Sequence, residues 1–170
     1  MANTIEVFFL EEEHIEVMVK SLNGTNVSRK REYFLKCLEE CQHSKRITLV
    51  AFINEDFAGS VNIIYESKYE YFRKNNIPEL NDLLVAPKYR KKGVGERLLE
   101  EAEEITTKTH DYLGLGVGLY KDYGSAHRLY ARKGYIPDGS GIMYDYKPVK
   151  PGEAVAVDDS LLLFLYKKLK

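Results

Sequence analysis

The chain has 170 residues, of which 44% are hydrophobic and 30% are charged. These values are typical of a soluble globular protein with a buried core, and we expect a single domain over residues 1–170. The formal net charge of −1 argues against a general nucleic-acid-binding surface.

Cysteine usage and the N-terminal segment bear on compartment and metal binding. Cys37 and Cys41 are four residues apart on a predicted helix, and no second pair exists to complete a zinc site, so we expect no metal. The N-terminus lacks a basic segment, and its apolar run 7–10 is too short for a signal or membrane segment. We therefore expect a cytoplasmic protein without membrane contact.

The first part of the chain predicts two helices and a hairpin. The predicted elements are a strand over 4–10, a helix over 11–22, a helix after Ser28, and strands over 47–53 and 57–65. Ser28 is the expected N-cap of the second helix. The short polar connection between the last two strands indicates a hairpin, and Gly59 marks a bulge or a close backbone contact.

The connection over 66–78 is long and carries aromatic side chains among charged ones. Long connections in compact domains are often functional, and this composition suits the wall of a ligand site. The alternative is a surface loop whose aromatic rings pack against the edge of the sheet.

The segment 80–105 has the clearest pattern in the chain. An apolar strand ends at Pro87, which cannot donate to a ladder. A helix with apolar residues at helical spacing follows, beginning near Val94. The turn between them carries four cations and two glycines, namely Lys88, Arg90, Lys91, Lys92, Gly93 and Gly95.

A strand, a glycine-bearing turn and a helix start form an arrangement that binds phosphate. The first N–H groups of a helix lack internal acceptors, and the helix dipole is positive there. Glycines let an anion reach those N–H groups, and the neighbouring cations add charge, so a pyrophosphate is the expected guest. The alternative is an ordinary turn with a solvated basic patch.

The following segment alternates glycine with apolar residues over 112–120, which predicts a strand with one bare face. Three glycines on one face indicate that something approaches the backbone closely, either a packed helix or a cofactor. Residues 126–133 have helical spacing and Gly134 is the expected C-cap. The last predicted strands cover 142–146 and 160–168.

Two of these patterns together resemble a known superfamily. Val85-x-Pro87-x-x-Arg90-x-x-Gly93-x-Gly95 resembles the coenzyme A pyrophosphate loop of the GNAT superfamily, the GCN5-related N-acetyltransferases. Ala126-x-x-Leu129-Tyr130-x-x-x-Gly134-Tyr135 resembles the second signature of that superfamily. The resemblance is specific over about 79–135 and loose elsewhere.

The resemblance implies an α/β (α+β) fold, a twisted mixed sheet flanked by helices on both faces, with splayed central strands. It implies acetyl-CoA as cosubstrate, with the pantetheine arm pairing with strand backbone at Leu83, Leu84 and Val85. The pyrophosphate would lie on Arg90, Lys91, Lys92, Gly93, Val94 and Gly95. Ala126 and Tyr123 complete the implied cofactor set, although many members carry asparagine where this chain has Tyr123.

The resemblance also implies a catalytic pair. Tyr130 falls at the general-acid tyrosine of the family and would protonate the departing thiolate; the alternative is a core tyrosine. Glu79 lies where some members hold a general base. Asp82 is its rival, three residues on and expected on the opposite face, and either carboxylate acts directly or through water or is simply solvated.

The predicted function is N-acetyl transfer from acetyl-CoA to an amine of a small molecule or peptide, by direct attack in a ternary complex. The alternative is a non-catalytic acyl-CoA-binding sensor or interaction module. Nucleic-acid binding through 88–92 is the weakest hypothesis, because the basic cluster is short. The resemblance is also compatible with a homodimer.

Overall fold

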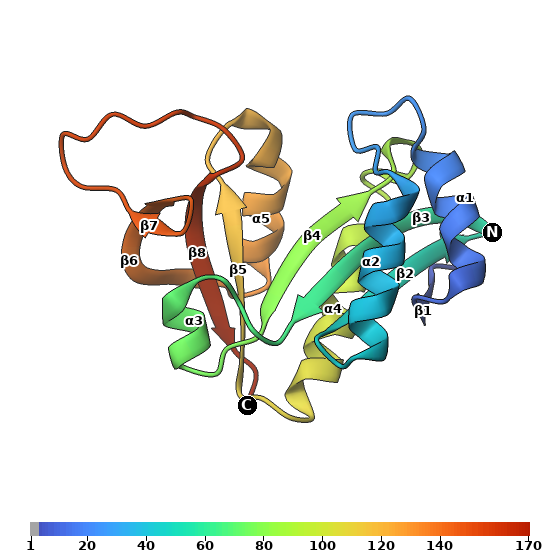
Figure 1. Cartoon of the computed structure of the whole chain (residues 1–170), viewed down its shortest axis with the longest axis horizontal. Coiled ribbons are helices and arrows are strands. Elements are labelled where there is room, and N and C mark those ends of the chain that lie inside the picture. Colours follow the sequence, from blue (N-terminus) through green and yellow to red (C-terminus); the bar gives the residue numbers. More distant parts are fainter. Residues whose placement is uncertain (1–3) are drawn as a thin grey trace. The chain divides into compact units, whose positions relative to one another are not determined.

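The computed structural model describes residues 4–170 (Figure 1). The strands are β1 (Glu6–Phe9), β2 (Arg46–Ile53), β3 (Asp56–Ile64), β4 (Glu79–Val85), β5 (Tyr112–Gly118), β6 (Ile136–Tyr144), β7 (Lys147–Pro148) and β8 (Leu161–Lys168). The helices are α1 (Glu12–Leu22), α2 (Arg31–Gln42), α3 (Glu70–Lys74), α4 (Val94–Thr107) and α5 (Gly124–Arg132), with 3-10 turns η1 (Pro87–Tyr89) and η2 (Lys121–Tyr123).

The strands are hydrogen-bonded in the order β1-β2-β3-β4-β5-β8-β6-β7. Most neighbours are antiparallel, whereas β4 and β5 are parallel. This mixed sheet with flanking helices confirms the predicted fold class. Among the described residues the β4–β5 ladder pairs Glu79 with Gly114 and Leu80 with Leu115. The splayed arrangement of the central strands that the resemblance implied stays a prediction.

The chain divides into two compact units that share β4. The first unit comprises the residues up to 65 together with 81–105, and the second comprises 66–80 and 106–170. The expectation of one domain over 1–170 stays a prediction.

In the first unit, helices cover both faces of the β2–β3 hairpin. A Cβ on Gly59 would meet Val94 and Leu98 of α4 at 3.0 and 3.2 Å. Asn62, three residues along β3 and therefore on the opposite face, donates from Nδ2 to the Tyr33 hydroxyl of α2 at 3.2 Å. The alternation of side chains along β3 thus separates the α4 face from the α2 face.

The β2–β3 hairpin is confirmed, and its turn chemistry is now defined. Asn54 and Glu55 both have positive φ, 50° and 65°, as a two-residue hairpin turn requires. Gly59 marks a close contact, because its Cβ would lie 2.6 Å from the Leu84 carbonyl oxygen. The ladder also shifts register between Ala51 and Phe52, beside the Ala51–Gly59 pair.

The predicted cap of α2 is wrong. The N-cap is Lys30, which makes no side-chain cap hydrogen bond, and its ψ of 153° keeps the chain extended up to the first helical residue. Ser28 therefore lies too far before the helix to reach its first N–H groups. The start of α2 is held instead by an ion pair, in which Arg31 Nε lies 2.6 Å from Glu16 Oε1 of α1.

In the second unit, β5 lies between β4 and β8, and an aromatic cluster covers one face. Tyr69 and Phe164 stack with ring centroids 3.8 Å apart, and Phe72 meets Phe164 edge-on at 5.4 Å. The buried cluster comprises Tyr69, Phe72, Ile77, Met143 and Phe164. The connection over 66–78 is therefore no surface loop, because it contains the short helix α3 and sends Tyr69 and Phe72 into the core.

The C-terminal strands differ from the prediction at one turn. Residues 142–144 of the predicted strand over 142–146 belong to β6, but its end is wrong, because β6 ends at Tyr144 and Asp145 and Tyr146 have φ values of 48° and 63° in the turn to β7. Earlier in β6 the ladder to β8 is interrupted between Pro137 and Ile142. The C-cap of α5 is Lys133; the predicted C-cap Gly134 is the next residue, and its φ of 86° is typical of a glycine that ends a helix.

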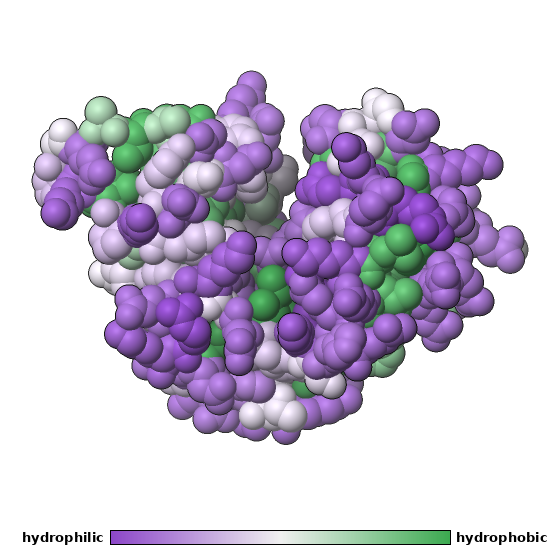
Figure 2. Space-filling model, viewed as in Figure 1, coloured by the Kyte–Doolittle hydropathy of each residue, from purple (hydrophilic) through white to green (hydrophobic). Residues whose placement is uncertain are grey.

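The outer surface over α1 and α2 is mainly hydrophilic, with a small apolar area among the polar side chains (Figure 2). Within residues 4–170, every helix is too short or too polar to span a bilayer.

Candidate functional site

The predicted phosphate-binding turn lies in the first unit, between β4 and α4. Lys91 and Gly93 both have positive φ, 60° and 83°, and the Arg97 N–H donates to the Gly93 carbonyl at 2.9 Å as α4 begins. The space beside Gly93 is open, since the nearest atom to a Cβ there would be Ile5 Cδ1 at 3.9 Å. The helix start is accessible, which the binding of a phosphate requires.

The cations of this turn have different neighbours. Lys88 Nζ lies 2.7 Å from Asp56 Oδ2, and hydrogen bonds from Lys88 and Tyr89 lower the pKa of the Asp56 carboxyl. Arg90 Nη2 donates to Asn26 Oδ1 at 3.2 Å. Lys92 Nζ lies 5.1 Å from the centre of the Tyr89 ring. Lys88 is thus engaged with β3, whereas Arg90, Lys91 and Lys92 remain the predicted phosphate ligands.

The backbone of β4 changes character at Asp82. Asp82 has a φ of 48°, which breaks the regular strand alternation just before Leu83, Leu84 and Val85. Simple alternation of side chains predicts that Glu79 and Asp82 lie on opposite faces of the strand. That assignment does not hold across the irregular backbone at Asp82. Of the three residues predicted to pair with a pantetheine arm, Leu84 is buried and Leu83 and Val85 are half-buried.

Asp82 is the end point of a chain of hydrogen bonds in the first unit. Its carboxylate accepts from Arg29 Nη2 at 2.8 Å and from the Tyr33 hydroxyl at 2.7 Å. Tyr33 in turn accepts from Asn62, whose side-chain oxygen accepts from Thr48 at 2.7 Å. Burial, and then the Asp82 charge, raise the pKa of Tyr33, so the phenol stays protonated and donates.

Glu79 belongs to the second unit and has a different environment. It is 5% exposed, and its Oε2 accepts a short hydrogen bond from the Ser67 hydroxyl. Its strand partner in the parallel ladder is Gly114. Asp82 is ion-paired with Arg29, and Glu79 accepts a hydrogen bond from Ser67.

Tyr130 lies on α5 in the second unit, one turn after Ala126. Its side chain is buried, and its ring centre lies 5.9 Å from that of Tyr135. Burial raises the pKa of Tyr130, because the phenolate is poorly solvated there. A hydroxyl in this environment keeps its proton at neutral pH and could donate it, but could not serve as a base.

Tyr123 occupies the bare face of β5. A Cβ on Gly118 would overlap its ring, and its hydroxyl donates to Asp159 Oδ1 at 2.8 Å. The other two glycines of this face are filled by Phe72 at Gly114 and by Phe164 at Gly116. The glycine pattern is thus explained by packed aromatic rings.

Sequence reasoning missed several residues of these networks, namely Arg29, Tyr33, Ser67 and Asp159. Arg29 lies 53 residues from Asp82, and Tyr123 lies 36 residues from Asp159. No local spacing signals such pairs. Only the glycine alternation of β5 indicated that bulky groups would approach the strand.

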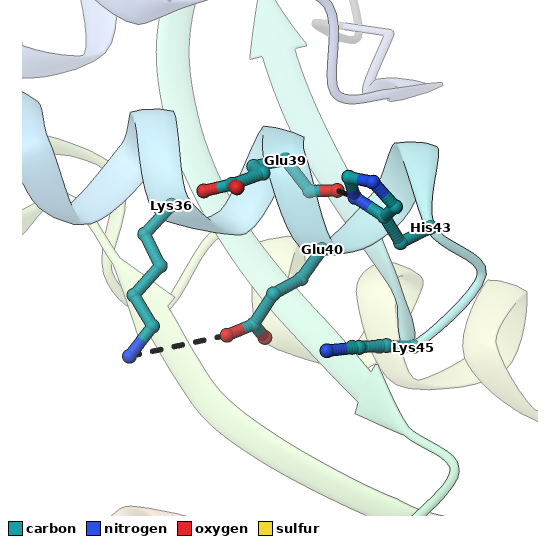
Figure 3. A pocket seen from close by; sticks show the side chains of 5 residues that line it. All are labelled: Lys36, Glu39, Glu40, His43 and Lys45. Atoms are coloured by element: carbon teal, nitrogen blue, oxygen red, sulfur yellow. Dashed lines mark hydrogen bonds and ion pairs between the residues drawn. The ribbon is translucent and has the colours of Figure 1, made fainter.

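A shallow pocket at the C-terminal end of α2 contains none of the predicted site residues (Figure 3). It is lined by Lys36, Glu39, Glu40, His43 and Lys45. Glu40 pairs with Lys36 at 3.9 Å and also with Arg46, and His43 Nδ1 lies 2.8 Å from the Glu39 carbonyl oxygen. Residues 4–170 contain no cluster of three or more His, Cys, Asp or Glu side chains that could hold a metal.

A family model described as "Acetyltransferase (GNAT) domain" matches residues 44–137, more than half of the chain. No curated protein sequence matches the chain significantly.

Solved structures show the same fold at low identity. The yncA acetyltransferase of Salmonella typhimurium, solved with its cofactor acetyl-CoA, is 19% identical at a TM-score of 0.67, with 99% of this chain and 95% of that chain covered. The spermidine/spermine N-acetyltransferase SpeG of Vibrio cholerae is 14% identical at a TM-score of 0.66, with 97% of this chain and 92% of that chain covered. A Salmonella typhimurium acetyltransferase that modifies the N-terminal serine of ribosomal protein L7/L12 is 11% identical at 0.70, with 97% and 95% covered.

Proposed function

Because the chain belongs to the GNAT acetyltransferase domain family, we propose that it transfers an acetyl group from acetyl-CoA to an amine of a small molecule or peptide, by direct attack in a ternary complex. The observation that carries this proposal is the extent of the family match, residues 44–137. That range includes Glu79, the turn at 90–95 and Tyr130, which are the residues proposed for the chemistry.

The first unit supplies the proposed pyrophosphate and pantetheine contacts. The open space beside Gly93 and the helix start at Val94 fit a phosphate, and Arg90, Lys91 and Lys92 would neutralise its charge. The backbone of Leu83 to Val85 would pair with the pantetheine arm. Among the described residues this stretch lies beyond the β4–β5 ladder, which supports that role.

The second unit supplies the proposed acid and base. Tyr130 would give its proton to the departing thiolate. A phenol is protonated at neutral pH even at its ordinary pKa of about 10, and burial raises the pKa of Tyr130, which retains the proton and makes the phenol a weaker acid. Glu79 would take a proton from the acceptor ammonium, since an amine must be neutral to attack. We favour Glu79 over Asp82 because the Asp82 carboxylate is already held by Arg29 and Tyr33.

The remaining cofactor residues are Ala126 and Tyr123. Ala126 lies one turn before Tyr130 on α5 and matches the family signature. The Tyr123 ring packs over Gly118, so we propose that any contact it makes with the cofactor is through its ring edge rather than through an amide as in many members.

The acceptor class follows from the relatives only as a proposal. SpeG acts on spermidine and spermine, and the Salmonella enzyme on a protein N-terminus. We propose a primary amine of either kind as acceptor. A homodimer and a cytoplasmic location are further predictions from the sequence.

Free-thiol release from acetyl-CoA, measured with polyamines, aminoglycosides, amino acids and peptide N-termini, tests the proposed activity. The proposed activity is supported if the wild-type chain turns over at least one amine class and the Tyr130→Phe variant turns over the same amine much more slowly. Tight acetyl-CoA binding without turnover on any amine would favour the second candidate, a binding module that holds acyl-CoA.

A further inference from the structure

The Glu79 carboxylate lies within the second unit beside an aromatic wall. Glu79 and Gly114 are partners in the parallel ladder, so their side-chain positions project to the same face of the sheet. The ring of Phe72 fills the place of the missing Gly114 side chain. A carboxylate 5% exposed in such surroundings needs hydrogen-bond donors to stay ionised.

Ser67 is such a donor, and of the Glu79 carboxylate and the Tyr69 backbone N–H, which both bond to its hydroxyl, only Glu79 can accept the proton. Ser67 is 1% exposed, and its Oγ accepts the Tyr69 backbone N–H at 3.0 Å. A hydroxyl has a single proton, and a backbone N–H cannot accept it. The Ser67 proton is therefore directed to Glu79 Oε2, with which Oγ makes a short hydrogen bond.

The backbone around Ser67 is fixed by α3. Arg73 Nη1 donates to the Ser67 carbonyl at 3.1 Å and lies 3.4 Å from the Lys68 carbonyl oxygen. Tyr69 anchors the same segment through its stack on Phe164. The hydroxyl thus reaches Glu79 from a segment held at both its side chains and its backbone.

Glu79 also interacts electrostatically with Tyr146. Burial, and then the charge of Glu79, raise the pKa of the Tyr146 phenol, so this phenol keeps its proton at neutral pH. Asp145, the neighbour of Tyr146, contributes to the same rise. The Arg73 guanidinium is bound to the backbone carbonyl of Ser67, the residue that donates to Glu79.

We propose that Ser67 is a positioning residue that holds Glu79 ionised and in one orientation for proton abstraction from the acceptor. The inference rests on the proposed function. In the step concerned, an N–H bond of the acceptor ammonium breaks, its electron pair stays on nitrogen, and the proton forms an O–H bond with the Glu79 carboxylate. The Ser67 hydroxyl keeps its own proton and stabilises the carboxylate before the transfer.

The experiment compares four variants of the full chain by the pH dependence of kcat/KM. Ser67→Ala removes the donor, Ser67→Thr keeps a hydroxyl, and Glu79→Gln removes the base. Thr106→Val is the matched control, because within the described chain the Thr106 hydroxyl is also buried but has no hydrogen-bond partner. Melting temperatures exclude variants that fail to fold.

Loss of the donor disfavours the charged carboxylate, so the acid limb of the Ser67→Ala profile should move to higher pH. At about pH 6 its kcat/KM should be roughly tenfold below wild type, and at about pH 9 within a few-fold of it. Ser67→Thr and Thr106→Val should keep the wild-type profile. An unmoved acid limb in Ser67→Ala, while Glu79→Gln loses rate, overturns the positioning role and leaves the proposed function standing.

A second measurement separates this inference from the proposed function. The Glu79 carboxyl ¹³C signal, assigned by its absence in Glu79→Gln, is titrated in wild type and in Ser67→Ala without any acceptor. A midpoint unchanged by Ser67→Ala overturns the inference even if no acceptor is ever found. A moved midpoint with a fully active Glu79→Gln refutes Glu79 as base and, with it, the catalytic role of Ser67.

Discussion

The ring of Tyr123 lies over Gly118, in the space that a side chain at that position would need. Tyr123 ends the turn η2 and is the N-cap of α5, and Gly118 ends β5. His127 adds a second tie between the same elements, because its Nε2 lies 2.7 Å from the Gly118 carbonyl oxygen and must carry the proton. The last residue of β5 is thus fixed to the helix that carries Tyr130.

Substituting Gly118 should show how much this contact stabilises the fold. Gly118→Ala adds a Cβ that overlaps the Tyr123 ring, and overpacking of this kind costs typically about 1–3 kcal/mol. Gly124→Ala is the control, since a Cβ there meets no atom within 4 Å and alanine favours a helix. Urea unfolding should show a loss for Gly118→Ala and no loss for Gly124→Ala.

The double variant Gly118→Ala with Tyr123→Ala tests the cause of that loss. Removing the ring vacates the space, so Gly118→Ala should then cost much less than it does in the wild-type background. Equal costs in both backgrounds would mean that the ring does not limit the space at Gly118.

Gly93→Asn should weaken acetyl-CoA binding without unfolding the chain. Asparagine tolerates the φ of 83° better than other side chains, and the open space beside Gly93 accommodates it in the free protein. The added side chain then occupies the proposed path of the pyrophosphate. The rise in melting temperature that acetyl-CoA produces by mass action should shrink or disappear.

Gly134→Asn is the matched control for this substitution. Among the described residues, Gly134 has a φ of 86° and no atom within 4 Å of an added Cβ, whereas a Cβ on Gly93 would meet only Ile5 Cδ1 at 3.9 Å; Gly134 lies at the end of α5. It should cost similar stability and leave the acetyl-CoA-induced shift unchanged. A full shift in Gly93→Asn would contradict the phosphate-binding role of the turn.

Local patterns explain which parts of the fold were predictable. The β4–turn–α4 segment and the Gly134 cap depend on residues within a few positions of one another, so their sequence pattern is sufficient. The helix α3 was missed because it has only five residues, too few to establish a helical period. Ser28 looked like a cap, but nothing in its neighbourhood showed that the chain stays extended through Lys30.

The candidate site was predictable only where its residues fall in the two family patterns. The partners of Asp82 and Glu79 come from segments remote in sequence, and neither Arg29 nor Ser67 belongs to a recognisable motif. The positive φ of Asp82 was also hidden, because an aspartate within an apolar strand gives no sign of its backbone conformation. The alternation of side chains along a regular strand therefore does not apply at Asp82, where it was used to place Glu79 and Asp82 on opposite faces.

Asp82→Asn should reduce stability more than it affects chemistry. The neutral amide weakens the charge-assisted hydrogen bond from Arg29, and its NH₂ group cannot accept from Tyr33. The side chains of Arg29 and Asp82 are 33% and 24% exposed, so solvent screening limits the loss in the free energy of unfolding to roughly 1 kcal/mol. Urea unfolding measures this loss, and a pH-dependent loss of rate that recovers at high pH would instead make Asp82 the base.

Tyr69 should make the fold sensitive to alkali. Burial and the hydrogen bond to Asp138 raise the pKa of Tyr69 to about 12, above the value near 10 of an unfolded tyrosine. The unfolded chain therefore loses this proton first, so the contribution to stability is present below about pH 10 and is lost as pH rises toward 12. Over that window the free energy of unfolding should fall less steeply in Tyr69→Phe than in wild type.

Tyr71→Phe controls for the loss of a tyrosine hydroxyl two residues away, on α3, because Tyr71 is 37% exposed. Its unfolding free energy should follow the wild-type slope. Identical slopes for Tyr69→Phe and wild type would mean that Tyr69 ionises alike in the folded and unfolded chain.

Tyr130→Phe distinguishes an enzyme from a binding module, since it keeps the buried ring and removes only the hydroxyl. Burial raises the pKa of Tyr130, so its proton is retained at neutral pH and can pass to a thiolate leaving group. If the hydroxyl acts in the transition state, kcat should fall by roughly 10²-fold, within the range of general acid catalysis. Acetyl-CoA affinity, measured by the same thermal shift as for Gly93→Asn, should change little.

Tyr135→Phe is the control for the hydroxyl of a neighbouring buried ring, whose centre lies 5.9 Å from that of Tyr130. It should leave kcat within a few-fold of wild type, because Tyr135 follows the helix C-cap and has no proposed part in the transfer. A merely structural Tyr130 predicts the reverse split, a lower melting temperature with unchanged kcat at saturating acetyl-CoA. That result would remove Tyr130 as the acid and require another donor for the thiolate.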